Sequence, residues 1–171
     1  MKKPRVMALL ALLTFSGVGY FGVRPFVDIK PDVTFTTLKG AKIDLKALRG
    51  SPVLVAFWAS DCGVCMQEMP LLSSLHEQFS TSGLQLVGVA MDYDIPRQVV
   101  EAVEAKRLPF PVAYDLQGRY AKAFGGVRWV PDSFLLGPDG DIVLHWQGLP
   151  DLPLLRTTIG QLLNKKARHV A

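Results

Sequence analysis

The sequence predicts an α/β fold with a mixed β-sheet, and three observations lead to this prediction. Two short apolar runs, 52–58 and 84–91, have the length and composition of strands that are buried on both faces. A segment whose apolar residues have helical spacing follows each run, which is typical of parallel strands joined by helices. Later in the chain, two strand-like runs flank the turn sequence GPDGD at 137–141, which predicts an antiparallel hairpin. The sheet should therefore contain strands of both directions.

The expected elements follow one another without an internal repeat. A small hairpin about a Lys39-Gly40 turn comes first. The first helix should end near residue 79, and Pro96 should open the second because proline fits the first helical turn. The expected strands are 33–37, 42–45, 52–58, 84–91, 110–114, 133–136 and 142–146, and the later helices are 96–107, 119–124 and 153–164. The expected inward stripes are Leu71, Leu72, Leu75 and Phe79 in the first helix and Leu155, Ile159, Leu162 and Leu163 in the last.

The composition is that of one globular domain with an apolar N-terminal segment. Of the 171 residues, 49% are hydrophobic, 20% are charged and only two are cysteine, which excludes a disulfide-stapled scaffold. The formal net charge of +4 comes from the basic residues within 1–24, because the 15 basic and 15 acidic residues of the remainder balance. Without a basic excess in the folded part, the protein is not expected to bind nucleic acid.

The first 24 residues are predicted to be a membrane anchor. Residues 6–23 carry no charge and follow Lys2, Lys3 and Arg5. As a helix this run spans about 27 Å, close to the ~30 Å hydrocarbon core, and its basic flank favours a cytoplasmic start. The alternative is a cleaved signal peptide, which would release a soluble domain. In both cases residues 25–32 form a linker and residues 33–171 form one domain outside the cytoplasm, where disulfides persist.

Both cysteines lie in the motif Cys62-Gly63-Val64-Cys65, directly after a buried strand and at the start of a helix. A C-x-x-C motif in this position indicates a thioredoxin-like redox site. Residues three apart in a helix face one another, so the two sulfurs can close a disulfide. The helix N-terminus stabilises the thiolate of Cys62, which is the predicted nucleophile, and the more buried Cys65 resolves the mixed disulfide.

Residues 58–70 (WASDCGVCMQEMP) resemble the W-A-x-W-C-x-x-C-x-x-E-x-P stretch of the membrane-anchored TlpA/ResA-like thioredoxins of the bacterial envelope. The similarity extends over most of residues 30–165 and includes the segments 110–112 (FPV), 130–131 (VP) and 137–142 (GPDGDI). The resemblance implies a thioredoxin fold, a mixed central sheet flanked by helices, with an N-terminal β-hairpin and a central strand–helix insertion. The 66-residue step from Cys65 to Pro131 has room for this insertion.

The resemblance also implies a substrate-binding region around Pro131. This residue matches the family's cis-proline, which faces the cysteine pair and leaves the preceding backbone free to pair with an extended substrate. Trp58, Trp129 and Val130 are expected to contact substrate beside it. The alternative is an ordinary trans proline that opens an edge strand.

Glu68 matches the family's active-site glutamate. It follows Cys65 by three residues, which places both side chains on one face of a helix. There Glu68 could accept the proton that Cys65 must lose. Other thioredoxins carry a buried aspartate six residues before the first cysteine, but that position is Ala56 here. The alternative is a solvated helix glutamate.

Two residues depart from the family pattern, and both bear on redox tuning. Asp61 replaces the tryptophan before the first cysteine, and Val64 replaces the proline between the cysteines, beside Gly63. Asp61 could cap the helix, and its negative charge would oppose the thiolate of Cys62. We therefore expect a less acidic Cys62 than in typical relatives.

The resemblance implies a thiol–disulfide oxidoreductase that is anchored by a single segment in the bacterial inner membrane and faces the periplasm. It would act on protein disulfides as a reductant, with electrons from a transmembrane thiol carrier, often in cytochrome c maturation. No cofactor and no resident metal are expected beyond the cysteine pair. The alternatives are a dithiol oxidase or isomerase, an inert disulfide in a binding module, and a copper or zinc carrier using the cysteines, with or without His76. His76, His145 and His169 are isolated in the sequence, which disfavours the metal carrier.

Overall fold

The computed structural model describes residues 30–170, including the side chains through Lys165. The predicted anchor and most of the predicted linker lie outside the described residues, so both stay predictions. Among residues 30–170, no helix has the length and apolar character needed to cross a membrane.

The order of elements agrees with the sequence-based prediction, and most boundaries differ by one or two residues. The strands are β1 (Thr34–Thr36), β2 (Lys42–Asp44), β3 (Val53–Trp58), β4 (Gln85–Ala90), β5 (Val112–Tyr114), β6 (Asp132–Leu136) and β7 (Ile142–Gln147). The helices are α1 (Gly63–Phe79), α2 (Pro96–Lys106), α3 (Arg119–Ala123) and α4 (Leu152–Val170).

The central sheet is mixed, as predicted, and its strand order is β5-β4-β3-β6-β7. Strands β3, β4 and β5 are parallel because helices connect them, whereas β6 and β7 are antiparallel to their neighbours. Strands β1 and β2 form a separate two-stranded antiparallel sheet. The fold class predicted from the sequence is confirmed.

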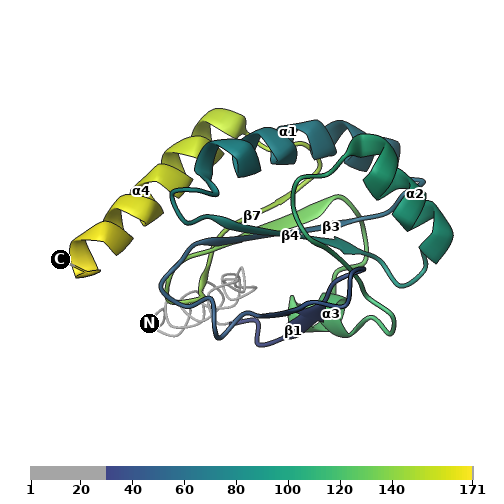
Figure 1. Cartoon of the computed structure of the whole chain (residues 1–171), viewed down its shortest axis with the longest axis horizontal. Helices are drawn as coiled ribbons and strands as arrows, with labels where there is room; N and C mark the ends of the chain where they lie inside the picture. Colours follow the sequence, from purple (N-terminus) through teal and green to yellow (C-terminus); the bar gives the residue numbers. More distant parts are fainter. Residues whose placement is uncertain (1–29, 171) are drawn as a thin grey trace, which may run out of the picture.

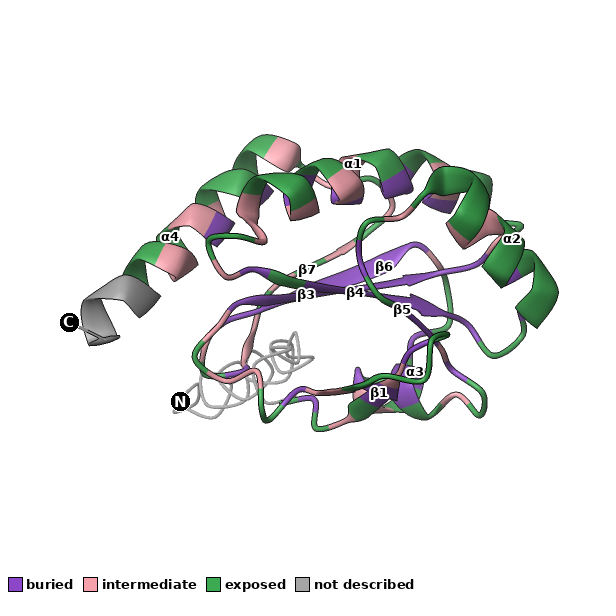
Figure 2. Cartoon of the chain, viewed as in Figure 1, coloured by how far each residue is buried: buried purple, intermediate pink, exposed green. Residues whose placement is uncertain are grey.

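Two layers cover the central sheet on opposite sides (Figure 1). Helices α1, α2 and α4 cover one side, which we call the helical face, and β1, β2 and α3 cover the other, which we call the hairpin face. Strand β3 is buried along its whole length because its side chains alternate between the two layers (Figure 2). Leu54, Ala56 and Trp58 belong to the helical face, and the residues between them belong to the hairpin face.

The helical face corrects two details of the predicted packing. The buried side chains of α1 are Cys65, Glu68, Met69, Leu72 and Leu75. Leu71, predicted to point inward, is only half-buried because it is one residue, about 100° of helix rotation, away from Leu72 in this stripe. In α4, Leu155 and Ile159 are buried, but the helix extends beyond the predicted end at residue 164 and past the sheet (Figure 1). Leu162 and Leu163 are therefore only partly buried.

The hairpin face is held together by aromatic rings. The centroid of Phe124 lies 5.2 Å from that of Phe57 and 5.0 Å from that of Phe134. The ring of Phe35 meets Tyr120 edge-on at 4.8 Å, and the Tyr120 hydroxyl accepts a hydrogen bond from the Thr36 N–H. Such ring pairs prefer edge-to-face contacts, so this cluster fastens β1 and α3 to the sheet.

Candidate active site

The cysteine motif begins helix α1 at the end of β3. Cys62 is the N-cap residue, and its Sγ accepts a hydrogen bond from the Cys65 N–H at 3.1 Å. The prediction that Asp61 caps the helix is wrong, because the sulfur already uses a donor that a capping side chain would take.

The two sulfurs form a disulfide, and their environments differ. The Cα atoms of Cys62 and Cys65 lie 5.2 Å apart, within the usual range for a disulfide. Cys62 is half-buried at the helix start, whereas Cys65 is completely buried one turn inward. A substrate disulfide can therefore reach the sulfur of Cys62, and the sulfur of Cys65 is shielded from solvent.

The segment before β6 lies against the cysteine pair. The Val130–Pro131 peptide bond is cis, as predicted, and the Val130 carbonyl oxygen lies 3.7 Å from Cys62 Sγ. Trp129 is 76% exposed beside this contact. The structure thus brings Trp129, Val130 and Pro131 together at the half-buried sulfur.

Trp58 does not belong to this surface. Its side chain is 0% exposed, so it cannot contact a docked protein, and the predicted substrate-binding role is wrong. It lies on the helical face of β3, where Gly88 of the neighbouring strand makes room for it. A Cβ atom at Gly88 would lie 3.3 Å from the Trp58 Nε1. The indole therefore fills the core behind the motif.

Glu68 is buried, so the alternative of a solvated helix glutamate is excluded. Its Oε1 accepts hydrogen bonds from the Ser133 hydroxyl at 3.1 Å and from the Trp146 indole N–H at 3.3 Å. Its Oε2 has no hydrogen-bond partner. Burial raises the pKa of Glu68 to about 7, and the two hydrogen bonds oppose this shift. A carboxyl with such a pKa can take up and release a proton near neutral pH.

The sequence analysis missed Ser133 and Trp146. They face each other across β6 and β7, and counting back from the GPDGD turn would pair Ser133 with His145 instead. A bulge between Leu135 and Leu136 shifts the register by one residue, which brings Trp146 to the helical face. No local feature of the sequence marks that bulge.

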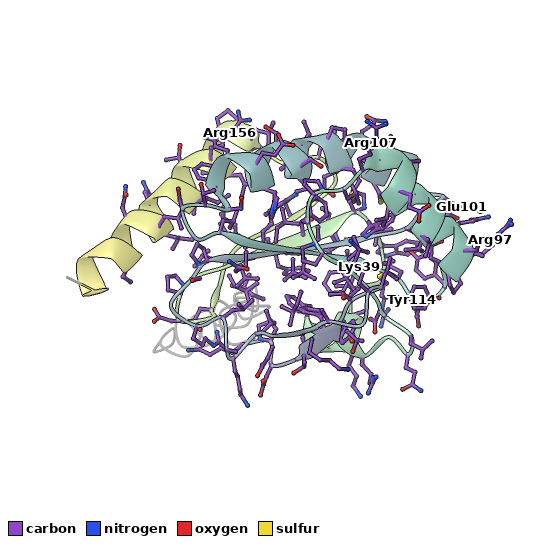
Figure 3. All side chains as sticks on the ribbon, viewed as in Figure 1. Lys39, Arg97, Glu101, Arg107, Tyr114 and Arg156 are labelled. Atoms are coloured by element: carbon purple, nitrogen blue, oxygen red, sulfur yellow. A yellow bond between two sulfur atoms is a disulfide. The ribbon has the colours of Figure 1, made fainter. Side chains whose placement is uncertain are left out.

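A second group that sequence analysis missed supports the loop before Cys62. The Asp94 carboxylate accepts hydrogen bonds from the Ser60 N–H and hydroxyl, both at 2.6 Å. The Tyr114 hydroxyl donates to the Asp94 carbonyl oxygen at 2.7 Å, and Figure 3 shows its ring in the part of the molecule where α2 begins. These bonds tie the approach to the cysteine motif to the segment after β4.

Comparison with known proteins identifies the family. The model of the AhpC/TSA family matches residues 28–145, which include both cysteines and the cis-proline. The chain belongs to the AhpC/TSA family. The thiol-disulfide oxidoreductase ResA of Bacillus cereus is 31% identical over 159 residues, which are 86% of this chain and 91% of that protein. The resemblance to TlpA/ResA-like thioredoxins is thus confirmed.

Solved structures lead to the same conclusion. A thioredoxin-like protein of Neisseria meningitidis superimposes with a TM-score of 0.73 at 29% identity, over 80% of this chain and 90% of that one. A protein of Chlorobium tepidum described as the thiol:disulfide interchange protein DsbE gives a TM-score of 0.72, also at 29% identity, over 80% and 96% of the two chains. Together with the cysteine geometry, these relatives show that this member of the AhpC/TSA family is a thioredoxin-fold thiol–disulfide oxidoreductase.

The residues predicted to tune the redox pair of this AhpC/TSA family member lie at the rim of the motif. Asp61, Gly63 and Val64 are exposed, with Val64 at 43%. Asp61 lies close enough to Tyr93 for its charge to act on that phenol. The pKa of Tyr93 is raised first by burial and then by the charge of Asp61. The effect of Asp61 on the cysteines themselves stays a prediction.

A metal site that combines the cysteines with His76 is not formed. His76 lies 11 residues after Cys65 in α1, which is about 16 Å along the helix axis at 1.5 Å per residue. Its ring meets Phe110 edge-on in the core. Among the side chains through Lys165, no group of three His, Cys, Asp or Glu residues is arranged to hold a metal ion. His76 is therefore out of reach of the cysteines as a shared metal ligand.

Proposed function

We propose that this oxidoreductase reduces protein disulfides outside the cytoplasm, from a position tethered to the inner membrane. The observation that carries the proposal is the asymmetry of the cysteine pair. Cys62 is half-buried at the N-terminus of α1 beside the Val130 carbonyl, whereas Cys65 is enclosed behind it. This asymmetry divides the reaction into an attack at the surface and a release from the core.

In the first step, the Cys62 thiolate attacks one sulfur of a substrate disulfide. A bond forms between Cys62 Sγ and that sulfur, and the substrate's own disulfide breaks to release a thiolate. The N-terminus of α1 and the Cys65 N–H, which lies 3.1 Å from Cys62 Sγ, favour negative charge on Cys62. The exposed Trp129 and the backbone at Val130 lie where the substrate segment would dock.

In the second step, Cys65 loses its thiol proton and attacks Cys62 Sγ. The Cys62–Cys65 disulfide forms, the mixed disulfide breaks, and the second substrate sulfur leaves as a thiolate. The substrate gains two electrons and the protein loses two. Glu68, three residues after Cys65 on the same face of α1, accepts the Cys65 proton. No cofactor is needed, because the cysteine pair carries both electrons.

The direction, location and electron source rest on the sequence. The uncharged run at 6–23 behind three basic residues supports a single anchor with the domain on the outer side. The TlpA/ResA-like resemblance supports reduction, a transmembrane thiol carrier as the donor, and cytochrome c maturation as the setting. The names of the ResA and DsbE relatives agree with thiol–disulfide exchange.

Two measurements test the proposal. The reduction potential of the Cys62–Cys65 pair should lie near that of thioredoxin, about −270 mV, and a value near −120 mV would instead indicate an oxidant. Cys62→Ser should abolish reduction of a protein disulfide by the dithiothreitol-charged chain. Cys65→Ser should trap mixed disulfides on non-reducing gels, because attack persists without release. Trapping by Cys62→Ser instead would reverse the two roles.

A further inference from the structure

We propose that Ser133 and Trp146 are positioning residues that assign the proton of Glu68 to one carboxyl oxygen, Oε2. This inference rests on the proposed function, in which Glu68 accepts a proton from Cys65. It adds the identity of the oxygen that does so and the residues that select it.

Both donors come from one rung of the sheet. Ser133 and Trp146 are directly paired between β6 and β7, so their side chains lie on the same face. Both donate to Oε1 of Glu68, at 3.1 and 3.3 Å, and Oε2 receives no hydrogen bond. Ser133 is paired on its other side with Ala56 of β3, whose methyl group takes little space beneath α1. Ser133 and Trp146 therefore hold the carboxylate of Glu68, which extends from α1 to the sheet.

The chemistry of the donors decides where the proton binds. A carboxyl oxygen has two lone pairs, and on Oε1 both are occupied by donors. The indole N–H of Trp146 can only donate, so it cannot accept a hydrogen bond from an O–H group. A proton on Oε1 would displace at least one donor, whereas a proton on Oε2 leaves both bonds in place. Protonated Glu68 thus keeps Oε1 as its carbonyl oxygen and carries its O–H at Oε2.

Cys65 lies close to Glu68 along the chain, within one turn of α1. Cys65 and Glu68 are three residues apart on the inward stripe of α1, and both are completely buried. The proton leaves the Cys65 thiol and binds Oε2, and the electron pair stays on Cys65 Sγ for attack on Cys62. Among the described residues, Asp132 is the titratable group whose negative charge also raises the pKa of Glu68. It lies on the opposite face of β6 from Ser133, where its carboxylate pairs with His145 and Gln147.

The test follows the Glu68 carboxyl directly, by ¹³C NMR titration of the full chain with labelled glutamate and the disulfide closed. The wild-type signal should titrate near pH 7 and be absent from Glu68→Gln. Trp146→Phe keeps an aromatic ring but removes the donor, and Ser133→Ala removes the other donor. Each should bind the proton about tenfold more tightly, because the lost hydrogen bond is stronger to the carboxylate than to the carbonyl oxygen of the protonated acid.

Two control variants separate positioning from packing. Leu144→Val alters the same face of β7 without touching a donor, and it should leave the Glu68 titration unchanged. Ser133→Thr keeps the hydroxyl and should restore the wild-type titration. An unchanged titration in Trp146→Phe and Ser133→Ala, or an equal shift in Leu144→Val, would overturn the inference. The titration needs no turnover, so loss of the proposed function, seen as a wild-type chain that reduces no protein disulfide, would be recognised separately.

Discussion

Two buried carboxylates, one on each face of the central sheet, differ in how their oxygens are hydrogen-bonded. On the hairpin face, Asp115 accepts a backbone N–H of α3 on each oxygen, at 3.0 Å from Tyr120 and 2.8 Å from Ala121. On the helical face, Glu68 receives two donors on one oxygen and none on the other. Both residues are almost completely buried, so burial alone does not separate them. They differ in how the hydrogen-bond donors are distributed over the two carboxylate oxygens.

This difference in donors separates a structural carboxylate from one suited to proton transfer. Asp115, with a donor on each oxygen, fixes the start of α3. A carboxylate with a bare oxygen in an apolar core binds a proton more tightly than in water. Asp115 on the hairpin face thus holds a helix in place, and Glu68 on the helical face is a group that can change its charge.

The largest effect should come from the hairpin face and should leave the redox chemistry unchanged. Phe124→Ala removes the ring that contacts both Phe57 and Phe134, and it should lower the free energy of unfolding by about 3–5 kcal/mol. Urea denaturation followed by tryptophan fluorescence measures this loss. The reduction potential of the folded variant should match that of the wild type, because Phe124 lies across the sheet from the cysteines. A shifted potential would show that the two faces are coupled.

The second effect is a pH dependence of stability that Glu68 introduces on the helical face. The pKa of Glu68 is about 7 in the folded chain and near 4.5 when exposed, so the folded state binds the proton more tightly. The resulting stabilisation is complete below pH 4.5 and is lost as the pH rises through 7, by roughly 3 kcal/mol at most. Glu68→Gln cannot titrate. The free energy of unfolding of the wild type minus that of Glu68→Gln should therefore fall between pH 4 and pH 8, and a constant difference would contradict the buried, partly unpaired carboxyl.

The sequence predicted the fold and the chemical centre because both depend on local patterns. Buried strands, helix starts and the C-x-x-C spacing are readable within a few residues, and they placed the cysteines at the start of α1. The partners of Glu68 were not predicted, because Ser133 and Trp146 meet only through a bulge in a hairpin 65 to 78 residues away. The N-cap was also assigned wrongly, since a sulfur and a carboxylate compete for the same N–H and the sequence does not show which is nearer.

The wrong prediction of a substrate contact at Trp58 also comes from a contact between distant strands. Trp58 stands three residues before the exposed Asp61, but its side chain turns inward because Gly88 on β4 leaves space for the indole. Strand pairing between distant segments created that space. Contacts across the sheet therefore limit what the sequence alone could assign in the site.

The third effect is on turnover. Glu68→Gln keeps an acceptor for Ser133 and Trp146 but cannot bind the Cys65 proton, so disulfide reduction should slow. We expect a loss of about 100-fold or less, the lower end for general acid–base catalysis. Stopped-flow kinetics of mixed-disulfide release measures it, and Glu77→Gln, in the same helix but exposed, is the matched control. Equal rates for the wild type and Glu68→Gln from pH 5 to pH 9 would assign Glu68 a purely structural part.

The smallest effect concerns Asp61, which lies on neither face but at the exposed rim before Cys62. Two unit charges roughly 6 Å apart repel by about 0.7–2.8 kcal/mol at an effective dielectric of about 80 to 20. Asp61→Asn removes this repulsion and leaves the helix start intact, because Cys62 itself is the N-cap. The substitution should therefore lower the pKa of the Cys62 thiol and make the pair more oxidising by roughly 15–60 mV, since a more stable thiolate favours the reduced form.

The rate of alkylation against pH reports the pKa of the Cys62 thiol, and equilibration with glutathione reports the reduction potential of the pair. Asp92→Asn serves as a control for the general loss of one negative charge from the loop after β4. If Asp61→Asn leaves the Cys62 pKa unchanged or raises it, the carboxylate points away from the sulfur, and the departure from the family's tryptophan at this position does not tune the redox pair.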